Sequence, residues 1–473
     1  MPSPADPLLI QGGMGVAVSS WPLASAVART GQLGVVSGTA LDLVVARRLQ
    51  DGDPGGHVRR ALGHFPLPEV AERVLDRYFR VDGRPAGTSY VPIPRLSIKP
   101  SLGAQELAMV GNFVEVWLAK EGHRGPVGIN FLEKIQMATP SAAYGAMLAG
   151  VDYVLMGAGI PREIPQLLDH LAKNEPASLR IEVAGSDESA AVEIDPVALS
   201  GGALPPPPRP RFLAIVSAHA LAGYLARDVA TRPDGFVVEG HRAGGHNAPP
   251  RGKLSIADDG QPVYGPRDDV DLARVAALGL PFWLAGTYGA PERLAEALAI
   301  GANGVQVGTV FAFSQESGFT PRIRAQLLAK LRDGTLTIRT DAHASPTGFP
   351  FKVAELADSL ADRPVRATRP RLCDLGYLRT PYLRDGGAIG YRCAAEPVHT
   401  FIRKGGTETD TVDRACLCNA LAANVGLAQT RRDGYTEEPL VTLGADLDGP
   451  RRLLDLYPDG WSTTQAVHWM LGE

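Results

Sequence analysis

The chain has 473 residues, of which 45% are hydrophobic and 21% are charged, and this composition is that of an ordinary globular protein. The formal net charge of −4 argues against a protein that binds nucleic acid or an anionic membrane surface. The N-terminal residues show no basic stretch followed by a long apolar run, and no stretch of 18 apolar residues occurs elsewhere. We therefore expect a cytoplasmic protein.

Eight short apolar runs alternate with helical patterns along the first two thirds of the chain. Near-continuous apolar character is typical of strands that are covered on both faces. The predicted strands are Leu8–Gln11, Leu33–Ser37, Val127–Phe131, Tyr153–Met156, Phe212–Val216, Gly235–Glu239, Pro281–Ala285 and Gly304–Val307. Eight strand–helix units, with no GxGxxG motif after the first strand, favour an α/β fold with a TIM (β/α)8 barrel over an open doubly wound sheet.

The remaining segments predict how the domains are organised. Residues 1–326 form the barrel, and residues 51–125 form a helical insertion, with helices at Glu69–Tyr78 and Gln105–Glu121, that we expect near the barrel mouth. The proline-rich stretch 203–211 is predicted to be a stiff linker. Residues 327–473 form an additional C-terminal region, and we expect its segment 345–352 to reach the mouth.

The reactive site of a TIM barrel lies at the C-terminal ends of its strands, so the residues that follow each strand are candidates. Glycines in these loops let backbone N–H groups approach a flat or anionic ligand. The loops after the seventh and eighth strands carry the glycine and threonine groups that a phosphate site needs. The candidates for ligand binding are Gly12, Gly13, Met14, Asn130, Gly244, Gly245, Gly286, Thr287, Gln306, Gly308 and Thr309.

Two further residues are candidates for catalysis. His246 presents an imidazole after the sixth strand, and Lys134 follows the third strand, where its ammonium group could stabilise an anionic ring or ligand. The alternative for each is a solvated loop or helix-start residue without a catalytic role.

Several motifs taken together resemble the nitronate monooxygenase family, which includes related FMN-dependent enoyl reductases. The matching segments occur in family order over about residues 8–316, and they read IQGGMG, LGVVSG, PVGINF, GAGIP, DGFVVEGHRAGGH, PFWLAGTYG and ALAIGANGVQVGTVF. The resemblance implies a TIM barrel that holds non-covalent FMN. It places Gly12, Gly13 and Met14 by the isoalloxazine, and the glycines at 244 and 245 near the phosphate.

One departure from the family pattern bears on the reaction. Nitronate oxidases of the family carry a base, a histidine, after strand four, whereas this chain has Gly157 there. The leading hypothesis is an FMN-dependent oxidoreductase that oxidises a nitronate-like substrate with O2. The alternative is an NAD(P)H-dependent enoyl reductase, in which His246 or Lys134 polarises an activated alkene or a thioester-bound acyl chain. A non-catalytic flavin-binding partner of a larger assembly and a flavin-free phosphosugar barrel also stay open.

The predicted partners are a small-molecule or carrier-bound substrate and a second copy of the chain in a homodimer, without nucleic acid or membrane. All four cysteines fall in the C-terminal region, at Cys373, Cys393, Cys416 and Cys418. Four thiolates could hold one zinc ion or an iron–sulfur cluster, with His399 as an additional ligand. The alternatives are buried free thiols and a redox-active pair.

Overall fold

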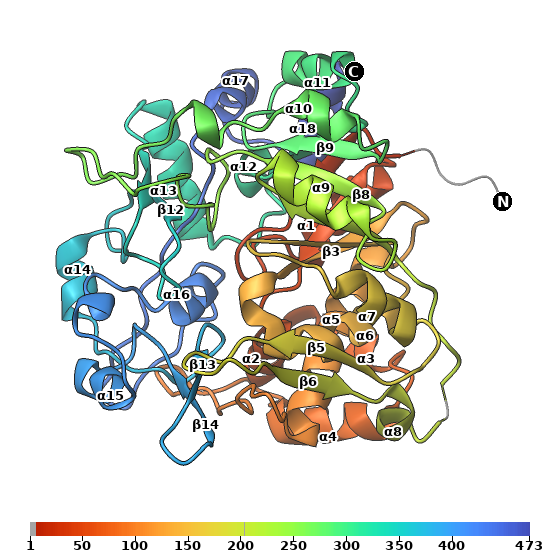
Figure 1. The fold of residues 1–473 in the computed structure, drawn as a ribbon, viewed down its shortest axis with the longest axis vertical. Coiled ribbons are helices and arrows are strands. Elements are labelled where there is room, and N and C mark those ends of the chain that lie inside the picture. Colours follow the sequence, from red (N-terminus) through yellow and green to blue (C-terminus); the bar gives the residue numbers. More distant parts are fainter. Residues whose placement is uncertain (1–5, 203) are drawn as a thin grey trace.

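Eight parallel strands close into a barrel in the order β1-β10-β9-β8-β7-β4-β3-β2 (Figure 1). The computed structural model describes residues 6–202 and 204–473, so that Ala203, at the start of the predicted linker, lies outside the described residues. The barrel strands are β1 (Leu9–Gln11), β2 (Leu33–Ser37), β3 (Val127–Leu132), β4 (Tyr153–Gly157), β7 (Arg211–Val216), β8 (Gly235–Glu239), β9 (Phe282–Ala285) and β10 (Gly304–Val307). The predicted TIM barrel and all eight of its strands are confirmed.

Helices surround the barrel and bury the outward-facing strand residues. They are α1 (Trp21–Arg29), α2 (Leu41–Gln50), α5 (Leu102–Lys120), α6 (Thr139–Leu148), α7 (Ile164–Leu171), α9 (His219–Arg227), α10 (Leu272–Ala276), α11 (Pro291–Ala299), α12 (Thr309–Ala312) and α13 (Pro321–Arg332). Many of these helices carry proline in the first turn, where its missing N–H costs no hydrogen bond.

The inward-facing residues of the strands form a separate apolar cluster inside the barrel. This cluster includes Val35 of β2, Ile215 of β7, Val237 of β8 and Trp283 of β9, all of them buried. Because side chains alternate along a strand, the residue two positions after each of these again faces inward, one layer closer to the mouth. The C-terminal ends of the strands therefore present a second inward layer to whatever occupies the mouth.

The helical insertion packs on the outside of the barrel, and its predicted place near the barrel mouth stays a prediction. After α2, the chain forms α3 (His57–Leu62) and α4 (Pro68–Tyr78), and then α5, which begins after the N-cap Ser101. Helix α5 is buried along most of its length because it packs against α1, α2 and α6 on the outside of the barrel. No described residue of the segment 51–125 lines the pocket at the mouth.

A second insertion follows α7, and the sequence pattern did not predict it. It consists of an antiparallel hairpin, β5 (Ala177–Ile181) and β6 (Ala190–Ile194), and the short helix α8 (Pro196–Ser200). In β5, buried residues alternate with exposed ones, which is the pattern of a strand covered on one face and differs from the continuously apolar barrel strands.

The C-terminal region packs against the barrel, and Figure 1 shows it in teal, cyan and blue. Its elements are β11 (Ile338–Asp341), β12 (Phe351–Ala354), α14 (Arg363–Thr368), β13 (Thr380–Leu383), β14 (Ile389–Arg392), α15 (Val398–Arg403), α16 (Leu417–Ala423), α17 (Asp448–Leu456) and α18 (Thr463–Leu471). Helix α18 packs against α1 and α11, and α17 packs against α13. Trp461 is fully buried, and its indole N–H donates to the carbonyl of Val310 at 3.1 Å. The last two helices thus extend the outer helical layer at the closure of the barrel.

None of the helices among residues 6–202 and 204–473 is long and apolar enough to cross a membrane.

Candidate functional site

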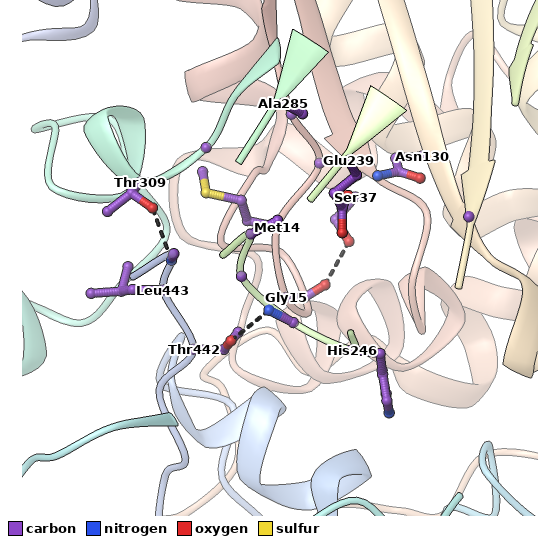
Figure 2. A pocket seen from close by; sticks show the side chains of 18 of the residues that line it. Met14, Gly15, Ser37, Asn130, Glu239, His246, Ala285, Thr309, Thr442 and Leu443 are labelled. Atoms are coloured by element: carbon purple, nitrogen blue, oxygen red, sulfur yellow. Dashed lines mark hydrogen bonds between the residues drawn. The ribbon is translucent and has the colours of Figure 1, made fainter. Parts of the chain in front are cut away.

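A pocket lies at the C-terminal ends of the barrel strands, and the sequence-predicted ligand-binding residues converge on it (Figure 2). The candidates that line this pocket are Gly12, Gly13, Met14, Asn130, Gly244, Gly245, His246, Gly286, Thr287, Gln306, Gly308 and Thr309. Residues separated by almost 300 positions therefore share one cavity, as the topology of a closed parallel barrel requires.

Two serines fix the glycine-rich loop that follows β1. The hydroxyl of Ser19 accepts a hydrogen bond from the backbone N–H of Met14 at 3.0 Å, and the hydroxyl of Ser37 donates to the carbonyl of Gly15 at 2.5 Å. A side chain at position 13 would place its Cβ 2.5 Å from the Cβ of Asn130, a distance at which one of the two residues must shift. Glycine at position 13 thus keeps the loop in close contact with β3 and leaves the cavity open above it.

The C-terminal region covers the end of the pocket that the sequence assigned to a phosphate group. Gly245 adopts a φ of +81°, and its N–H donates to the hydroxyl of Thr442 at 2.8 Å. The N–H of Gly444 donates to the hydroxyl of Thr309 at 2.9 Å. Each hydroxyl accepts in these contacts and keeps its own proton for an anionic ligand. Sequence reasoning missed Thr442 and Gly444 because they lie far from the barrel in the chain and carry no motif.

The C-terminal region also holds His246. The imidazole Nε2 of His246 lies 2.8 Å from the hydroxyl of Ser345, and its ring packs edge-on against Phe351, with the ring centroids 4.9 Å apart. Burial and the nearby Lys134 ammonium lower the pKa of His246 to about 3, so the ring is neutral at physiological pH. In Figure 2 the ring is directed away from Glu239, toward the C-terminal region. Phe351 lines the pocket, as expected for the segment 345–352.

Lys134 is not among the residues that line the pocket, in contrast to its predicted role there. It lies in the 3-10 helix Glu133–Ala138, and its Nζ sits 3.1 Å from the centroid of the Phe349 ring. Burial lowers the pKa of Lys134 to about 8. The ring of Phe349, which belongs to the C-terminal region, covers the ammonium group.

Glu239 is a pocket residue that the sequence reasoning did not single out. It is the last residue of β8 and faces the pocket, and burial raises the pKa of its carboxyl group to about 7. An acidic residue at the end of a predicted barrel strand was a signal that could have identified it.

Gly157, at the end of β4, has no space for a larger side chain. A Cβ at this position would lie 2.7 Å from the Cβ of Ile215 on the neighbouring strand β7. The pocket therefore has no base at strand four, and the apolar Ile215 side chain occupies the adjacent space.

The residues present in the pocket fit a flavin mononucleotide. The buried side-chain oxygen of Gln306 has no hydrogen-bond partner among the described residues, although it lines the pocket. Such an orphaned acceptor is expected where a ligand supplies the missing donor. The glycine loops after β1, β8 and β9 leave backbone groups accessible, and the hydroxyls of Thr309 and Thr442 lie at the same end of the cavity. The assignment of individual FMN contacts stays a prediction.

The four cysteines gather in one cluster in the C-terminal region, but the predicted metal site is not supported. Cys393 and Cys416 are buried, and Cys373 and Cys418 pack against them. Within residues 6–202 and 204–473, no three or more His, Cys, Asp or Glu side chains are arranged to hold a metal ion. The Cys416 sulfur accepts from the Asn419 amide at 3.5 Å, and Cys418 lines the pocket at the barrel mouth. His399 is exposed on α15.

Comparison with known proteins agrees with this geometry. Residues 212–345, which run from β7 to the loop after β11, match the model of the nitronate monooxygenase family. The predicted resemblance to this family is confirmed. The prediction of a flavin-dependent oxidoreductase, without its substrate or half-reaction, is confirmed as well.

The chain is similar to several solved structures, all at low sequence identity. FabK from Thermotoga maritima has 15% identity and a TM-score of 0.47, with 99% of this chain and 92% of that chain covered. Nitroalkane oxidase from Streptomyces ansochromogenes has 15% identity and a TM-score of 0.45, with 99% and 95% covered. The enoyl reductase domain of MlnA from Bacillus amyloliquefaciens has 12% identity and a TM-score of 0.40, with 76% and 65% covered. No curated protein matches the chain.

Proposed function

We propose that the protein is an FMN-dependent oxidoreductase that reduces an activated alkene, such as an α,β-unsaturated thioester, with NADPH or NADH as the electron donor. When bound, FMN would supply the hydride chemistry, and the pocket residues bind and orient the reactants. The glycine loops and Gln306 would hold the cofactor, and the cavity beside Ile215 would receive the acceptor.

The observation that carries this proposal is the contact between position 157 and Ile215. Oxidation of a neutral nitroalkane begins with removal of a proton from carbon, which needs a base with a pKa near the operating pH. Gly157 provides no such group at the strand-four position, and Ile215 fills the space that a base at this position would need. Reduction of an alkene requires no base at the strand-four position, so it agrees with this arrangement.

The charge of the pocket supports the same choice. Among the residues that line it, His246 is neutral because burial and Lys134 lower its pKa to about 3. The ammonium of Lys134 itself lies against Phe349. A neutral acceptor such as a thioester suits this environment better than an anionic nitronate, which would lose its hydration without gaining a cation.

A second candidate is the oxidation of a preformed nitronate by O2. It is favoured by the family match over residues 212–345, and a nitronate has already lost the proton that a strand-four base would remove. If the protein only binds flavin as a non-catalytic partner in a larger assembly, no substrate should reduce or reoxidise its flavin.

One anaerobic experiment tests these candidates. The purified protein is loaded with FMN, and its visible spectrum is recorded before and after addition of NADPH or NADH. We expect bleaching by one of the nucleotides, followed by recovery of the spectrum when crotonyl-pantetheine thioester is added. If the nucleotides leave the flavin oxidised while the nitronate of nitroethane bleaches it, the reductase proposal is wrong and the nitronate oxidase is favoured.

A further inference from the structure

The position of Glu239 in the barrel directs its side chain into the mouth. Val237 belongs to the apolar cluster inside the barrel, and Glu239, two residues later on β8, faces the same way. The strand register pairs Glu239 with Ala285 of β9, which is also an inward-facing residue. Glu239 thus belongs to the uppermost inward layer of the barrel, which forms the floor of the pocket (Figure 2).

The carboxyl group of Glu239 has no partner in this environment. No hydrogen bond or salt bridge of its side chain occurs within the described part of the chain, in contrast to most buried acidic residues of this protein. An unpaired carboxyl group at the floor of a cavity is costly unless it is protonated or serves a ligand.

The charged groups on the elements around β8 are engaged elsewhere. On β7, Arg211 lies at the opposite end of the strand and pairs with Asp6. On β9, no residue is charged.

In the loop after β8, the His241 ring stacks on Tyr264 with the ring centroids 4.3 Å apart, and Arg242 follows it. Lys134 is covered by Phe349, and Lys352 donates to Thr340 at 2.6 Å. Burial alone raises the pKa of Glu239 to about 7, with no contribution from these charges.

We propose that Glu239 is the proton donor of the pocket and protonates the carbon of the acceptor that does not receive the hydride. This inference rests on the proposed reductase function, and it gives this chain a proton-transfer group that the strand-four position lacks. The pocket would then hold its acid at β8, two strands away from Gly157 in the order β4-β7-β8.

The proposed step adds one hydride and one proton across the C=C bond of the acceptor. A hydride adds to the β-carbon of the unsaturated thioester, and the electron pair of the C=C bond moves toward the thioester carbonyl. The O–H bond of Glu239 breaks as a new C–H bond forms at the α-carbon, which gives the saturated thioester. The carboxylate that remains takes up a proton from water before the next turnover. A carboxyl group with a pKa near 7 can both give and regain this proton at neutral pH.

The test compares the wild type with Glu239→Gln and Glu239→Asp, and with Glu133→Gln as the matched control. Burial also raises the pKa of Glu133, but its carboxylate accepts from Gln136 at 2.6 Å and does not line the pocket. FMN-loaded protein is reduced anaerobically, and its reoxidation by crotonyl-pantetheine thioester is followed by stopped-flow absorbance between pH 5.5 and 8.5. We expect the wild-type rate to fall above about pH 7, and the rate of Glu239→Gln to be at least about 100-fold lower and independent of pH. Glu239→Asp should restore part of the rate, and Glu133→Gln should behave as the wild type.

A second measurement does not depend on turnover. The infrared carbonyl band of a protonated carboxylic acid is titrated in the protein without FMN. The wild type and Glu133→Gln should lose a band near pH 7 that Glu239→Gln lacks throughout. FMN affinity is measured in parallel by fluorescence titration and should change less than about threefold in Glu239→Gln.

The outcomes separate the possible errors. If Glu239→Gln keeps the wild-type rate and pH profile, the proton-donor role is wrong, while the proposed reductase stands. If Glu239→Gln loses FMN affinity and its pH profile is unchanged, the carboxyl group is a cofactor ligand and the inference also fails. A wild type that is reduced by neither nucleotide overturns the proposed reductase, and the inference falls with it.

Discussion

The imidazole Nε2 of His246 lies 2.8 Å from the hydroxyl of Ser345, and this contact joins the loop after β8 to the C-terminal region. The backbone reinforces it, because the N–H of Lys352 donates to the carbonyl of Gly245 at 2.9 Å and His246 pairs with Phe351 in an antiparallel bridge. The orientation of the histidine in the barrel loop therefore depends on a segment about a hundred residues later in the chain. The C-terminal region is part of the pocket wall and not an appendage.

The buried neutral state of His246 should make folding sensitive to acid. In the folded chain its pKa is lowered to about 3, whereas an unfolded histidine titrates near 6.5. As the pH falls below about 6.5, the unfolded chain takes up a proton that the folded chain does not, so stability is lost. We expect His246→Gln to reduce the loss of unfolding free energy between pH 7.5 and pH 5 by about 2 kcal/mol.

Urea denaturation of the FMN-free protein at the two pH values measures this difference. His399→Gln, which changes an exposed histidine on α15, is the control and should leave the loss unchanged. Equal acid sensitivity in the wild type and in His246→Gln would show that His246 is protonated in the folded chain.

Thr442 is predicted to contribute to cofactor binding from the C-terminal region. Its hydroxyl accepts the N–H of Gly245 at 2.8 Å and lies at the proposed phosphate end of the pocket. Thr442→Val keeps the shape of the side chain but leaves this N–H without an acceptor and removes one donor for the phosphate. We expect the FMN dissociation constant to rise about tenfold, which corresponds to about 1.4 kcal/mol.

Fluorescence titration of FMN measures this change, with Thr368→Val on the exposed side of α14 as the control. If Thr442→Val binds FMN as tightly as the wild type, the phosphate group does not lie at this end of the pocket.

The fold could be predicted from the sequence because its signals are local. Each barrel strand is a short apolar run, such as Val127–Leu132, and each is followed by a helical pattern, so period and order were enough. The hairpin of β5 and β6 differs from the barrel strands because its residues alternate between buried and exposed, so it lacks the continuously apolar runs that mark the barrel. The sequence of α5 shows that it is helical and apolar but not which surface buries it.

The candidate site could be predicted in part, for a related reason. Residues such as Gly13 and Gln306 follow barrel strands, and the topology alone brings strand ends together. Thr442 and Phe349 could not be placed because their contacts depend on how the C-terminal region folds back over the barrel. The same holds for Lys134, which does not line the pocket and whose ammonium group is covered by Phe349 of the C-terminal region.

Cys373 should be the most reactive of the clustered thiols. Its contact with the Cys393 thiol, together with Arg379 and Arg95, lowers the pKa of Cys373, whereas burial and neighbouring thiols raise the pKa of Cys418 well above its usual value. Because the thiolate is the nucleophile, iodoacetamide at pH 7 should alkylate Cys373 first. Peptide mass spectrometry over time measures the order, and faster labelling of Cys418 than of Cys373 would contradict it. In Cys373→Ser the fast phase of alkylation should be absent.

The contact between Gly157 and Ile215 predicts what happens when the missing base is introduced. Gly157→His places a Cβ 2.7 Å from the Cβ of Ile215 in a buried position, and overpacking of this kind costs about 1–3 kcal/mol of unfolding free energy. Ile215→Ala removes the obstructing atoms. The double variant should therefore lose less stability than the sum of the two single variants, because the two side chains are in contact. Urea denaturation of all four proteins gives the coupling free energy, and strict additivity would mean that the two positions do not compete for the same space.

In the double variant the imidazole of Gly157→His has room beside the cavity. We expect nitroethane to bleach the flavin of this variant under anaerobic conditions, which it should not do in the wild type or in Ile215→Ala.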